Sequence, residues 1–362
     1  MLNMDQKLIK RQEEGKIIKT GIVGAGQMGR GMVTQMVLMN GITPAIVSDI
    51  KVENAVHAFK YAGVSDEDIV IAKTLADANA AMEAGKYVAC EDANFVSQAN
   101  LVECAIDATG VPDVGAKVET DVVIGPYLKK LAQKEGVIYT GSAGDEPGAV
   151  MELYSFAKAM GMNVEVMGKG KNNKIDYECN PDTVLEEATR RVMSPKMLCA
   201  FKDGTKTMVE MTAMSNYTGL IPDVIGGHGP KTAPGTEGVK ELNDIFKLKE
   251  DGGILNKHGV VEYVNGIAPG VFVTVSTPNE EIAYQMGYHS MGPGPLWTLY
   301  RPFHLCNLET PLTVAKAVID GEVTCVPIDG LVSECITRAK IDLKAGQTID
   351  GIGGYYRNSR RI

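Results

Sequence analysis

Aromatic residues are scarce in this sequence, and long hydrophobic runs are missing from it, which excludes membrane-spanning proteins. Only 6% of the 362 residues are aromatic. The chain has no uninterrupted apolar stretch of about 18 residues, the length that a membrane span requires. Residues 1–16 are polar and lack the apolar core of a secretory signal peptide, so we predict a cytoplasmic protein that does not enter a membrane.

Cysteine patterns and positive charge are also limited. The seven cysteines are scattered singly, with no CxxC spacing, which indicates neither a disulfide framework nor a zinc site. The formal net charge of -9 excludes broad attraction to nucleic acid or anionic lipid, although it allows a local basic pocket for an anionic substrate. We therefore expect a small-molecule substrate, no nucleic-acid partner, and a homo-oligomer.

Glycine is abundant, at 40 residues, and short apolar runs alternate with helical stretches over residues 17–148. This alternation predicts a parallel sheet with crossover helices, that is, a Rossmann dinucleotide-binding domain in an α/β protein. Residues 149–321 have a mixed pattern, which predicts an α+β substrate and dimerisation domain. Residues 322–362 are typical of short strands and turns, and we expect a partial C-terminal β module there.

The hydrophobic periodicity predicts the individual elements. The expected strands are 17–23, 45–50, 69–72, 87–90, 103–109, 137–140, 163–167 and 271–276. The expected helices are 27–40, 51–62, 149–160, 181–192 and 207–217, after a short amphipathic helix at the start of the chain. Polar and glycine-rich composition predicts loops at 168–174 and 226–238.

The clearest motif is GAGQMG, which begins at Gly24, follows an apolar strand and opens a helix. In such a turn Gly24 permits the tight bend, Gly26 lets the backbone approach a pyrophosphate, and Gly29 allows close helix–strand packing. The first backbone N–H groups of the helix, at Gln27 and Met28, face the anion. Because the flanking strand and helix are both present, the motif predicts dinucleotide binding.

An acidic residue, Asp49, stands at the end of the second predicted strand. There it would accept hydrogen bonds from the adenosine ribose and would favour NAD by repelling a 2′-phosphate. Arg30 and Lys51 are close in sequence and would offset that repulsion, so NAD and NADP both stay open. Thr109 and Gly110 end a later strand at the carboxyl edge of the sheet, where ligands bind, and complete the predicted cofactor set.

Further motifs occur in order along the rest of the chain. They are GKGKNN from Gly168, DGTKTMVEM from Asp203, NYTG from Asn216, HGP from His228 and LYRPFHL from Leu299. Together these segments resemble the homoserine dehydrogenase-like oxidoreductases that carry a C-terminal SAF domain. That group includes the 1-deoxy-D-xylulose 5-phosphate reductoisomerase-like enzymes and the D-apionate oxidoisomerases. The resemblance implies an NAD(P)-dependent enzyme and a SAF-like module at 322–362.

The sequence departs from that family pattern at two places. After Ala116 the chain passes directly to Lys117, where the family has a further helix and strand near the nicotinamide. The SAF-like segment that begins at Gly351 stops before the expected end of such a module. We therefore expect a shortened member of the group, in which the nicotinamide half of the cofactor site is altered.

Hydride transfer from a carbinol requires a group that takes the hydroxyl proton and stabilises the developing alkoxide. A buried lysine suits both tasks, because desolvation lowers its pKa. Lys169 and Lys171 are our first candidates, as oxyanion donors or ligands of an anionic group, with Asn172 and Asn173 to orient hydroxyls. The alternative for this segment is a solvated basic turn.

Lys206 and Glu210 are spaced i,i+4 on a predicted helix, so they share a face and can pair. On the surface such a pair has little effect on stability, but inside a cleft it would hold Lys206 as a proton shuttle. Asp203, one turn earlier, would share that lysine. These three residues complete the predicted catalytic set.

The remaining substrate-binding candidates are Asn216, His228, Arg301 and His304. A guanidinium suits bidentate binding of a carboxylate or phosphate, whereas a lone histidine is more often structural. The segment 141–148 precedes a helix, and its N–H groups are candidates to bind an anion. Asp145, Glu146 and Glu152 are candidate divalent-cation ligands, but their spacing matches no metal signature, so no metal is predicted.

The sequence thus predicts an NAD(P)-dependent reductoisomerase or dehydrogenase that acts on the CH–OH or C=O group of a sugar phosphate or acid sugar. Homoserine dehydrogenase is the alternative enzyme, disfavoured because homoserine brings its own ammonium to a lysine-rich segment. A nucleotide-sensing or SAF-type binding protein without catalysis is the alternative from another class. The apparent gap after Ala116 favours that second alternative.

Overall fold

The computed structural model describes residues 3–109 and 118–362, which divide into two compact units. Unit 1 comprises residues 1–120, 130–144 and 305–325, and unit 2 comprises residues 121–129, 145–304 and 326–362. The chain therefore passes from unit 1 to unit 2 three times, after residues 120, 144 and 325. Its return to unit 1 at 305–325 had no signal in the sequence pattern.

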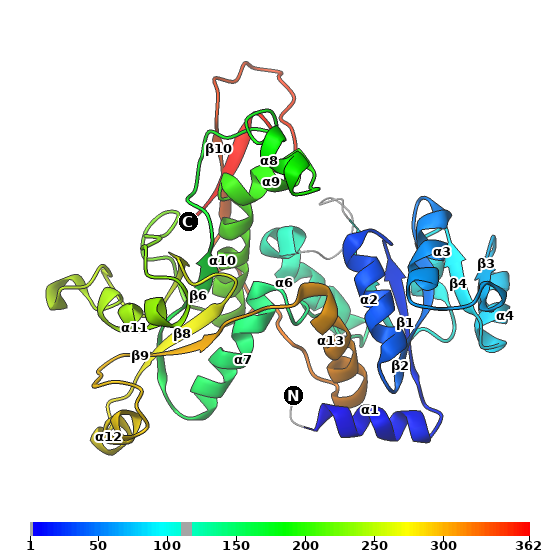
Figure 1. Cartoon of the computed structure of the whole chain (residues 1–362), viewed down its shortest axis with the longest axis horizontal. Coiled ribbons are helices and arrows are strands. Elements are labelled where there is room, and N and C mark those ends of the chain that lie inside the picture. The colour runs from blue at the N-terminus through cyan, green and yellow to red at the C-terminus, as the bar shows by residue number, and fades with distance from the viewer. Residues whose placement is uncertain (1–2, 110–117) are drawn as a thin grey trace. The chain divides into compact units, whose positions relative to one another are not determined.

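Unit 1 contains a five-stranded parallel sheet in the order β3-β4-β2-β1-β5 (Figure 1). Its strands are β1 (Ile18–Val23), β2 (Ile42–Ser48), β3 (Ile69–Ile71), β4 (Tyr87–Cys90) and β5 (Cys104–Asp107). Its helices are α1 (Met4–Glu13), α2 (Gln27–Leu38), α3 (Val52–Tyr61), α4 (Leu75–Glu83), α5 (Asn94–Gln98) and α13 (Cys306–Asp320). Because β2 and β5 flank β1 on opposite sides, the strand order reverses beside β1, where ligands bind in such sheets.

Both faces of this sheet are covered, which explains why its strands are rich in apolar residues and do not alternate regularly with polar ones. Met36 of α2, Phe59 of α3 and Val314 of α13 belong to the hydrophobic cluster on one face. Met82 of α4 and Val96 of α5 belong to the cluster on the other. The structure confirms the α/β class and the parallel Rossmann-type sheet.

Unit 2 contains a mixed sheet in the order β7-β6-β8-β9, in which only β6 and β7 are parallel. Its strands are β6 (Asn163–Lys171), β7 (Val260–Asn265), β8 (Val271–Ser276) and β9 (Trp297–Arg301), with a separate hairpin of β10 (Cys335–Ala339) and β11 (Arg357–Arg361). Its helices are α7 (Glu146–Ala159), α8 (Leu185–Arg190), α9 (Pro195–Lys202), α10 (Thr205–Thr218), α11 (Gly235–Ile245) and α12 (Glu280–Tyr288). Helix α6 (Val118–Lys134) contributes residues to both units.

Two layers of helices enclose the mixed sheet. Val150 of α7 and Met211 of α10 pack with Met167 of β6 on one face. Leu242 and Phe246, from α11 and its end, pack on the other face. Side chains alternate between the two faces along a strand. In β6, Lys169 and Lys171 therefore point to the same face as Met167, the face that α7 and α10 cover.

The predicted loop at 168–174 is wrong, because β6 continues to Lys171. A Cβ atom on Gly168 would overlap the carbonyl oxygen of Glu262 and lie 2.9 Å from Cζ of Phe272. A Cβ atom on Gly170 would overlap the backbone at Ala268. These two glycines therefore allow close packing of β6 against adjacent backbone of the same unit, and they do not form a loop that admits substrate.

Other predicted boundaries also need correction. Residues 137–140 form no strand, and only Gly141 beyond them makes an isolated bridge, to Cys325. The loop expected at 226–238 ends where α11 begins, at Gly235. Of the helix expected at 181–192, only α8 is helical, after a turn.

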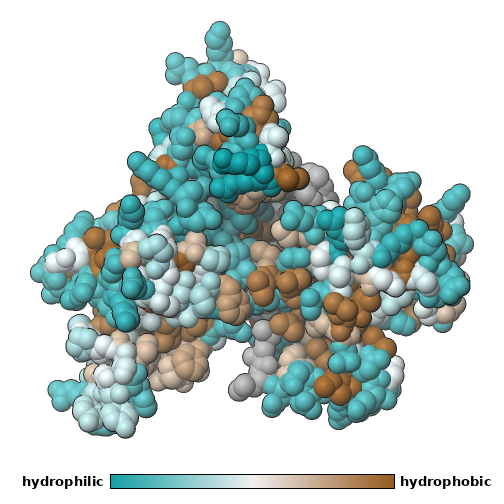
Figure 2. Space-filling model, in the orientation of Figure 1, coloured by the Kyte–Doolittle hydropathy of each residue, from teal (hydrophilic) through white to brown (hydrophobic). Residues whose placement is uncertain are grey.

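The surface is mixed in character. Figure 2 shows hydrophilic residues over most of one face, with hydrophobic residues in smaller groups between them. Within the described ranges, no helix combines the length and the apolar character needed to cross a membrane.

Candidate functional site

The glycine turn after β1 has the geometry of a dinucleotide-binding turn. Gly24 has φ +95°, and a Cβ atom there would lie 2.8 Å from the carbonyl carbon of Ala108. A Cβ atom on Gly29 would overlap the carbonyl oxygen of Gly24. At Gly26, by contrast, a Cβ atom would meet nothing within 4 Å. Two of the glycines are thus required by the fold, and Gly26 borders open space that a ligand can enter.

The start of α2 leaves its backbone donors available to an anion. Its N-cap, Gly26, has no side chain to accept from the first N–H groups, and the first turn carries no acidic residue. Gln27 and Met28 are exposed at this end. The unclaimed N–H groups and the helix dipole fit a pyrophosphate.

Asp49 follows β2 and is held in place by three hydrogen bonds. Its Oδ2 accepts from the backbone N–H of Ala25 at 2.8 Å. Its Oδ1 accepts from the N–H of Lys51 and from Nδ2 of Asn54, both at 3.0 Å. A carboxylate offers about four acceptor positions, so one remains for a ribose hydroxyl. Asp49 therefore links the glycine turn to the place where the adenosine ribose would bind.

The end of β5 contributes Thr109, whose N–H donates to Oδ1 of Asp107 at 2.9 Å. Gly110, the last predicted cofactor residue, lies outside the described residues. So does the segment around Ala116, where the sequence predicts the loss of a helix and a strand. Those two predictions stay untested.

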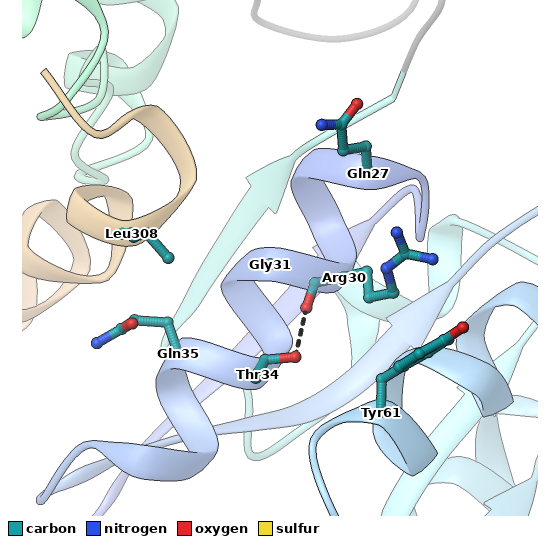
Figure 3. A pocket seen from close by; sticks show the side chains of 7 residues that line it. All are labelled: Gln27, Arg30, Gly31, Thr34, Gln35, Tyr61 and Leu308. Carbon is teal, nitrogen blue, oxygen red and sulfur yellow. Dashed lines mark hydrogen bonds between the residues drawn. The ribbon is translucent and has the colours of Figure 1, made fainter. Parts of the chain in front are cut away.

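A shallow groove runs along the outward face of α2, as Figure 3 shows. It is lined by Gln27, Arg30, Gly31, Thr34, Gln35, Tyr61 and Leu308. The guanidinium of Arg30 lies over the Tyr61 ring, 4.8 Å from its centroid. A pyrophosphate needs the N–H groups at the helix start, so the sequence predicts the dinucleotide at the glycine turn and not along this groove.

In unit 2, Lys169 lies at the centre of a buried charge cluster. Its Nζ donates to Oε1 of Glu146 at 2.5 Å and forms a second, very short contact with Oε2 of Glu210. The side chains of Lys169 and Glu210 are 7% and 0% exposed. Burial alone would lower the pKa of Lys169, but the two carboxylates outweigh burial and raise it. Lys169 is therefore a fixed cation.

Lys206 extends the cluster from α10. Its Nζ lies 2.9 Å from Oε1 of Glu210, which confirms the predicted i,i+4 pair, and 3.8 Å from Oδ1 of Asp145. Burial by itself lowers the pKa of Lys206, but Glu210 and the other nearby carboxylates raise it well above its usual value. Burial also raises the pKa of Glu210, and the negative charge of Glu146 adds to this effect.

Lys171 differs from the other two lysines. Its Nζ donates to Oδ1 of Asn173 and to the carbonyl oxygen of Phe201, both at 2.8 Å, and neither partner carries a charge. Burial and the neighbouring charge of Lys169 lower the pKa of Lys171 to about 8. Among these three lysines it is the one that changes protonation near neutral pH.

His304 joins the cluster through Glu146, whose Oε1 lies 3.5 Å from its Nε2. The carboxylates of Asp145, Glu146 and Glu210 offer oxygen atoms within 4.8 Å of one another, a grouping that could hold a cation. Ammonium groups occupy that role here, since Lys169 and Lys206 already pair with these oxygens. Lys169 and Lys206 therefore already neutralise part of the negative charge of this group.

Several sequence candidates lie elsewhere in unit 2. We expected Asp203 to share Lys206, and this prediction is wrong. The Oδ2 atom of Asp203 pairs instead with Nζ of Lys340, at 2.8 Å. Asn216 uses its Oδ1 to accept from the backbone of Val332 and Ser333, so its oxygen anchors that segment. In both cases a residue distant in sequence supplies the partner.

The last three candidates have different surroundings. Nε2 of His228 lies 2.6 Å from Oδ2 of Asp223, so the structure gives this histidine a carboxylate partner outside the lysine cluster. Nη1 of Arg301 lies 3.4 Å from Oε2 of Glu152, which is not part of the acidic group. Asn172 is exposed.

Sequence reasoning missed the catalytic potential of Glu146 and did not consider Lys340. Glu146 had one signal, its place at the first turn of a helix after a glycine-rich segment. Lys340 had none, because its partner Asp203 is 137 residues away.

Residues 144–310 match the family model described as "Oxidoreductase DRL, catalytic domain". No match was found among the curated proteins. The match excludes neither homoserine dehydrogenase nor reductoisomerase chemistry, and it ends before the predicted SAF-like module. Those finer assignments stay predictions.

Three solved structures are similar over most of their length. A myo-inositol dehydrogenase from Corynebacterium glutamicum is 10% identical, with 84% of this chain and 89% of that chain covered and a TM-score of 0.38. A UDP-N-acetylglucosamine 3-dehydrogenase from Acidithiobacillus ferrooxidans is 12% identical, with 85% and 91% covered and a TM-score of 0.37. A probable dehydrogenase from Thermotoga maritima is 13% identical, with 84% and 90% covered and a TM-score of 0.37. At these identities the likeness does not extend to the reaction. The family match and the parallel sheet together make this chain an enzyme of the oxidoreductase class with a Rossmann-type unit.

Proposed function

We propose that the protein is an NAD(P)-dependent oxidoreductase that interconverts CH–OH and C=O on a sugar phosphate or an acid sugar. The observation that carries the proposal is the lysine pair on β6. Lys169 is locked as a cation between two glutamates, whereas Lys171, on the same face of the strand, has a pKa of about 8. Such a pair offers one fixed charge and one proton acceptor.

In the oxidation direction, neutral Lys171 takes the proton of the substrate hydroxyl at its Nζ. A bound nicotinamide would supply the hydride acceptor for the carbon that carries this hydroxyl. Lys169 and Lys206 would donate hydrogen bonds to the alkoxide as it develops. Asn173 accepts from Lys171 and holds its Nζ in one direction. In the reduction direction the Lys171 ammonium returns the proton.

The composition of the cluster supports a substrate with many hydroxyl groups. Asp145, Glu146 and Glu210 accept hydrogen bonds from hydroxyls, while the ammonium groups donate to them. Arg301 and His304 stay our candidates for a carboxylate or phosphate on the substrate. NAD is favoured by Asp49, and NADP stays open because of Arg30 and Lys51.

The test follows absorbance of the reduced nicotinamide with NAD and NADP in turn. The substrates are 1-deoxy-D-xylulose 5-phosphate, linear and branched aldonic acids, polyols and homoserine. We expect turnover of a sugar phosphate or an acid sugar, and product analysis separates a dehydrogenase from a reductoisomerase. Turnover of homoserine alone would contradict the proposal. Cofactor binding without any turnover would favour the binding-protein alternative.

A further inference from the structure

Outside the proposed catalytic cluster, two cysteines of unit 2 lie side by side beside a buried lysine. The sulfur atoms of Cys179 and Cys199 are 3.7 Å apart, and the two residues are 2% and 0% exposed. Nζ of Lys340 lies 3.6 Å from the sulfur of Cys199, and its side chain is only 2% exposed. Neither spacing nor motif in the sequence indicated this arrangement.

The surroundings hold Lys340 against the sulfur of Cys199. Besides Cys199, its Nζ donates to Oδ2 of Asp203 at 2.8 Å and to the carbonyl oxygens of Cys179 and Gly354 at 2.7 and 3.0 Å. Asp203 in turn accepts from the N–H of Thr205, so it is itself fixed. A buried ammonium with this many partners stays charged and acts on the nearest thiol.

From this geometry we propose that Cys179 and Cys199 form a redox-active dithiol, which a small hydroperoxide converts to a disulfide. The sulfur atoms must approach from 3.7 Å to about 2.05 Å, a shift that small movements of the two segments can supply. Because both thiols are buried, the oxidant must be small. The dithiol does not depend on the proposed reaction of the enzyme.

The chemistry balances in two steps. The Cys199 thiolate attacks one oxygen of hydrogen peroxide, the O–O bond breaks, and hydroxide leaves and takes a proton, which gives a sulfenic acid. The Cys179 sulfur then attacks the Cys199 sulfur, the S–O bond breaks, and water leaves with the Cys179 proton. Two thiols lose two electrons and two protons, and the peroxide becomes two waters.

The protonation of the pair supports this order of events. A hydrogen bond from the Cys179 thiol lowers the pKa of Cys199, and the charge of Lys340 adds to this effect against burial. The pKa of Cys179 is raised, first by that same hydrogen bond and then by burial. Among the described residues, the charges of Lys171 and Tyr355 also interact with the pair, in addition to Asp203.

The other cysteines supply a matched control. Cys90 is as buried as Cys199 but has no lysine partner in the described structure, and burial raises its pKa to about 11. We therefore expect Cys90 to react slowly, although both thiols are equally hidden from solvent.

The experiment treats the reduced full-length protein with hydrogen peroxide, blocks the remaining thiols with an alkylating reagent and maps the peptides by mass spectrometry. In the wild type and in Cys90→Ser we expect one reversible linkage, between the peptides that contain Cys179 and Cys199. In Cys179→Ser we expect a Cys199 sulfenic acid that dimedone captures. Linkage of any other pair, or oxidation of Cys90 before Cys199, would overturn the proposal.

The role of Lys340 has its own measurement. At neutral pH we expect Lys340→Met to slow the peroxide reaction by about tenfold, and Lys340→Arg to restore most of it. The pH profile of the wild-type reaction serves as a second readout that needs no variant to fold. A rate that rises only through the ordinary pKa of a thiol would overturn the proposal, as would equal rates in wild type and Lys340→Met.

Discussion

The two units build their candidate functional groups from different materials. In unit 1 the glycine turn uses backbone N–H groups and one carboxylate, all between Gly24 and Asn54. In unit 2 the charge cluster uses side chains from α7, β6 and α10, with His304 beyond β9. The first is a local device in which spacing along the chain sets the geometry. The second exists only because tertiary packing brings opposite charges out of water together.

Because of this difference, substitutions in the two sites should have different consequences. A change in the glycine turn should weaken cofactor binding and leave unit 2 intact. A change in the charge cluster should affect both stability and reaction, because a buried charge without its partner is costly. Substitutions in each site can therefore separate a loss of cofactor binding from a loss of stability.

The largest effect is expected for Lys169→Met. The substitution leaves Glu146 and Glu210 buried without their shared ammonium, and breaking a buried pair costs about 3–5 kcal/mol. Denaturant unfolding measures the loss. The control is Lys174→Met, since Lys174 is exposed and close in sequence. Equal stability of the two variants would mean that the cluster does not hold unit 2 together.

A second large effect is expected for Lys171→Met, in activity. Loss of the proton acceptor should reduce kcat/KM by about 10²–10⁴-fold, the usual contribution of general acid–base catalysis. Lys174→Met again serves as the control and should keep its activity. Activity of Lys171→Met within a few-fold of wild type would remove Lys171 from the mechanism.

The same variant has a readout that needs no substrate. The pKa of Lys171 is about 8 in the folded protein and 10.5 as its ordinary value, so the unfolded chain binds more protons between these pH values. Stability of the wild type relative to Lys171→Met should therefore rise as the pH increases through this window. A difference in stability that does not change with pH would show that the pKa of Lys171 is not lowered.

A smaller effect is expected in the glycine turn, with Gly24→Ala compared with Gly63→Ala. Both glycines have positive φ, +95° and +87°, so both variants pay about 1–2 kcal/mol of backbone strain. Only Gly24 has backbone within 2.8 Å of the added Cβ, whereas Gly63 has open space. Calorimetric titration with NAD and NADP should show weakened binding only in Gly24→Ala. Equal affinities in the two variants would place the cofactor elsewhere.

The smallest effect is expected for Asp49→Asn. The amide keeps one acceptor oxygen but loses the charge, so NAD binding should weaken by about tenfold, or 1.4 kcal/mol, the size of one charge-assisted hydrogen bond. Binding of NADP should weaken less or improve, because the repulsion of its 2′-phosphate disappears. Parallel losses for both cofactors would mean that Asp49 only supports the turn through Ala25.

The fold of unit 1 was predictable because its signals are local. Short apolar runs mark β1 and β4 and the glycine turn marks the start of α2, and the observed bounds agree closely. In β6 the same logic failed. Gly168 and Gly170 suggested a loop, but they are required by the close approach of Glu262 and Ala268, which the sequence does not reveal.

The candidate site of unit 2 was predictable in part. The pair Lys206 and Glu210 followed from helical spacing, and the two lysines of β6 followed from the family resemblance. What the sequence could not show is which charges meet. Glu146 reaches Lys169 from 23 residues away and Glu210 reaches it from 41, and these partners decide which lysine is locked and which titrates.

The most direct test of the proposed chemistry is the pH dependence of kcat/KM for substrate oxidation, measured for wild type and for Lys171→Arg, which keeps a cation but cannot lose its proton. We expect the wild-type value to fall as the pH drops below about 8, because Lys171 becomes protonated and can no longer accept the hydroxyl proton. We expect Lys171→Arg to be slow and to lack that inflection. The same inflection in both proteins would contradict the assignment of Lys171 as the proton acceptor.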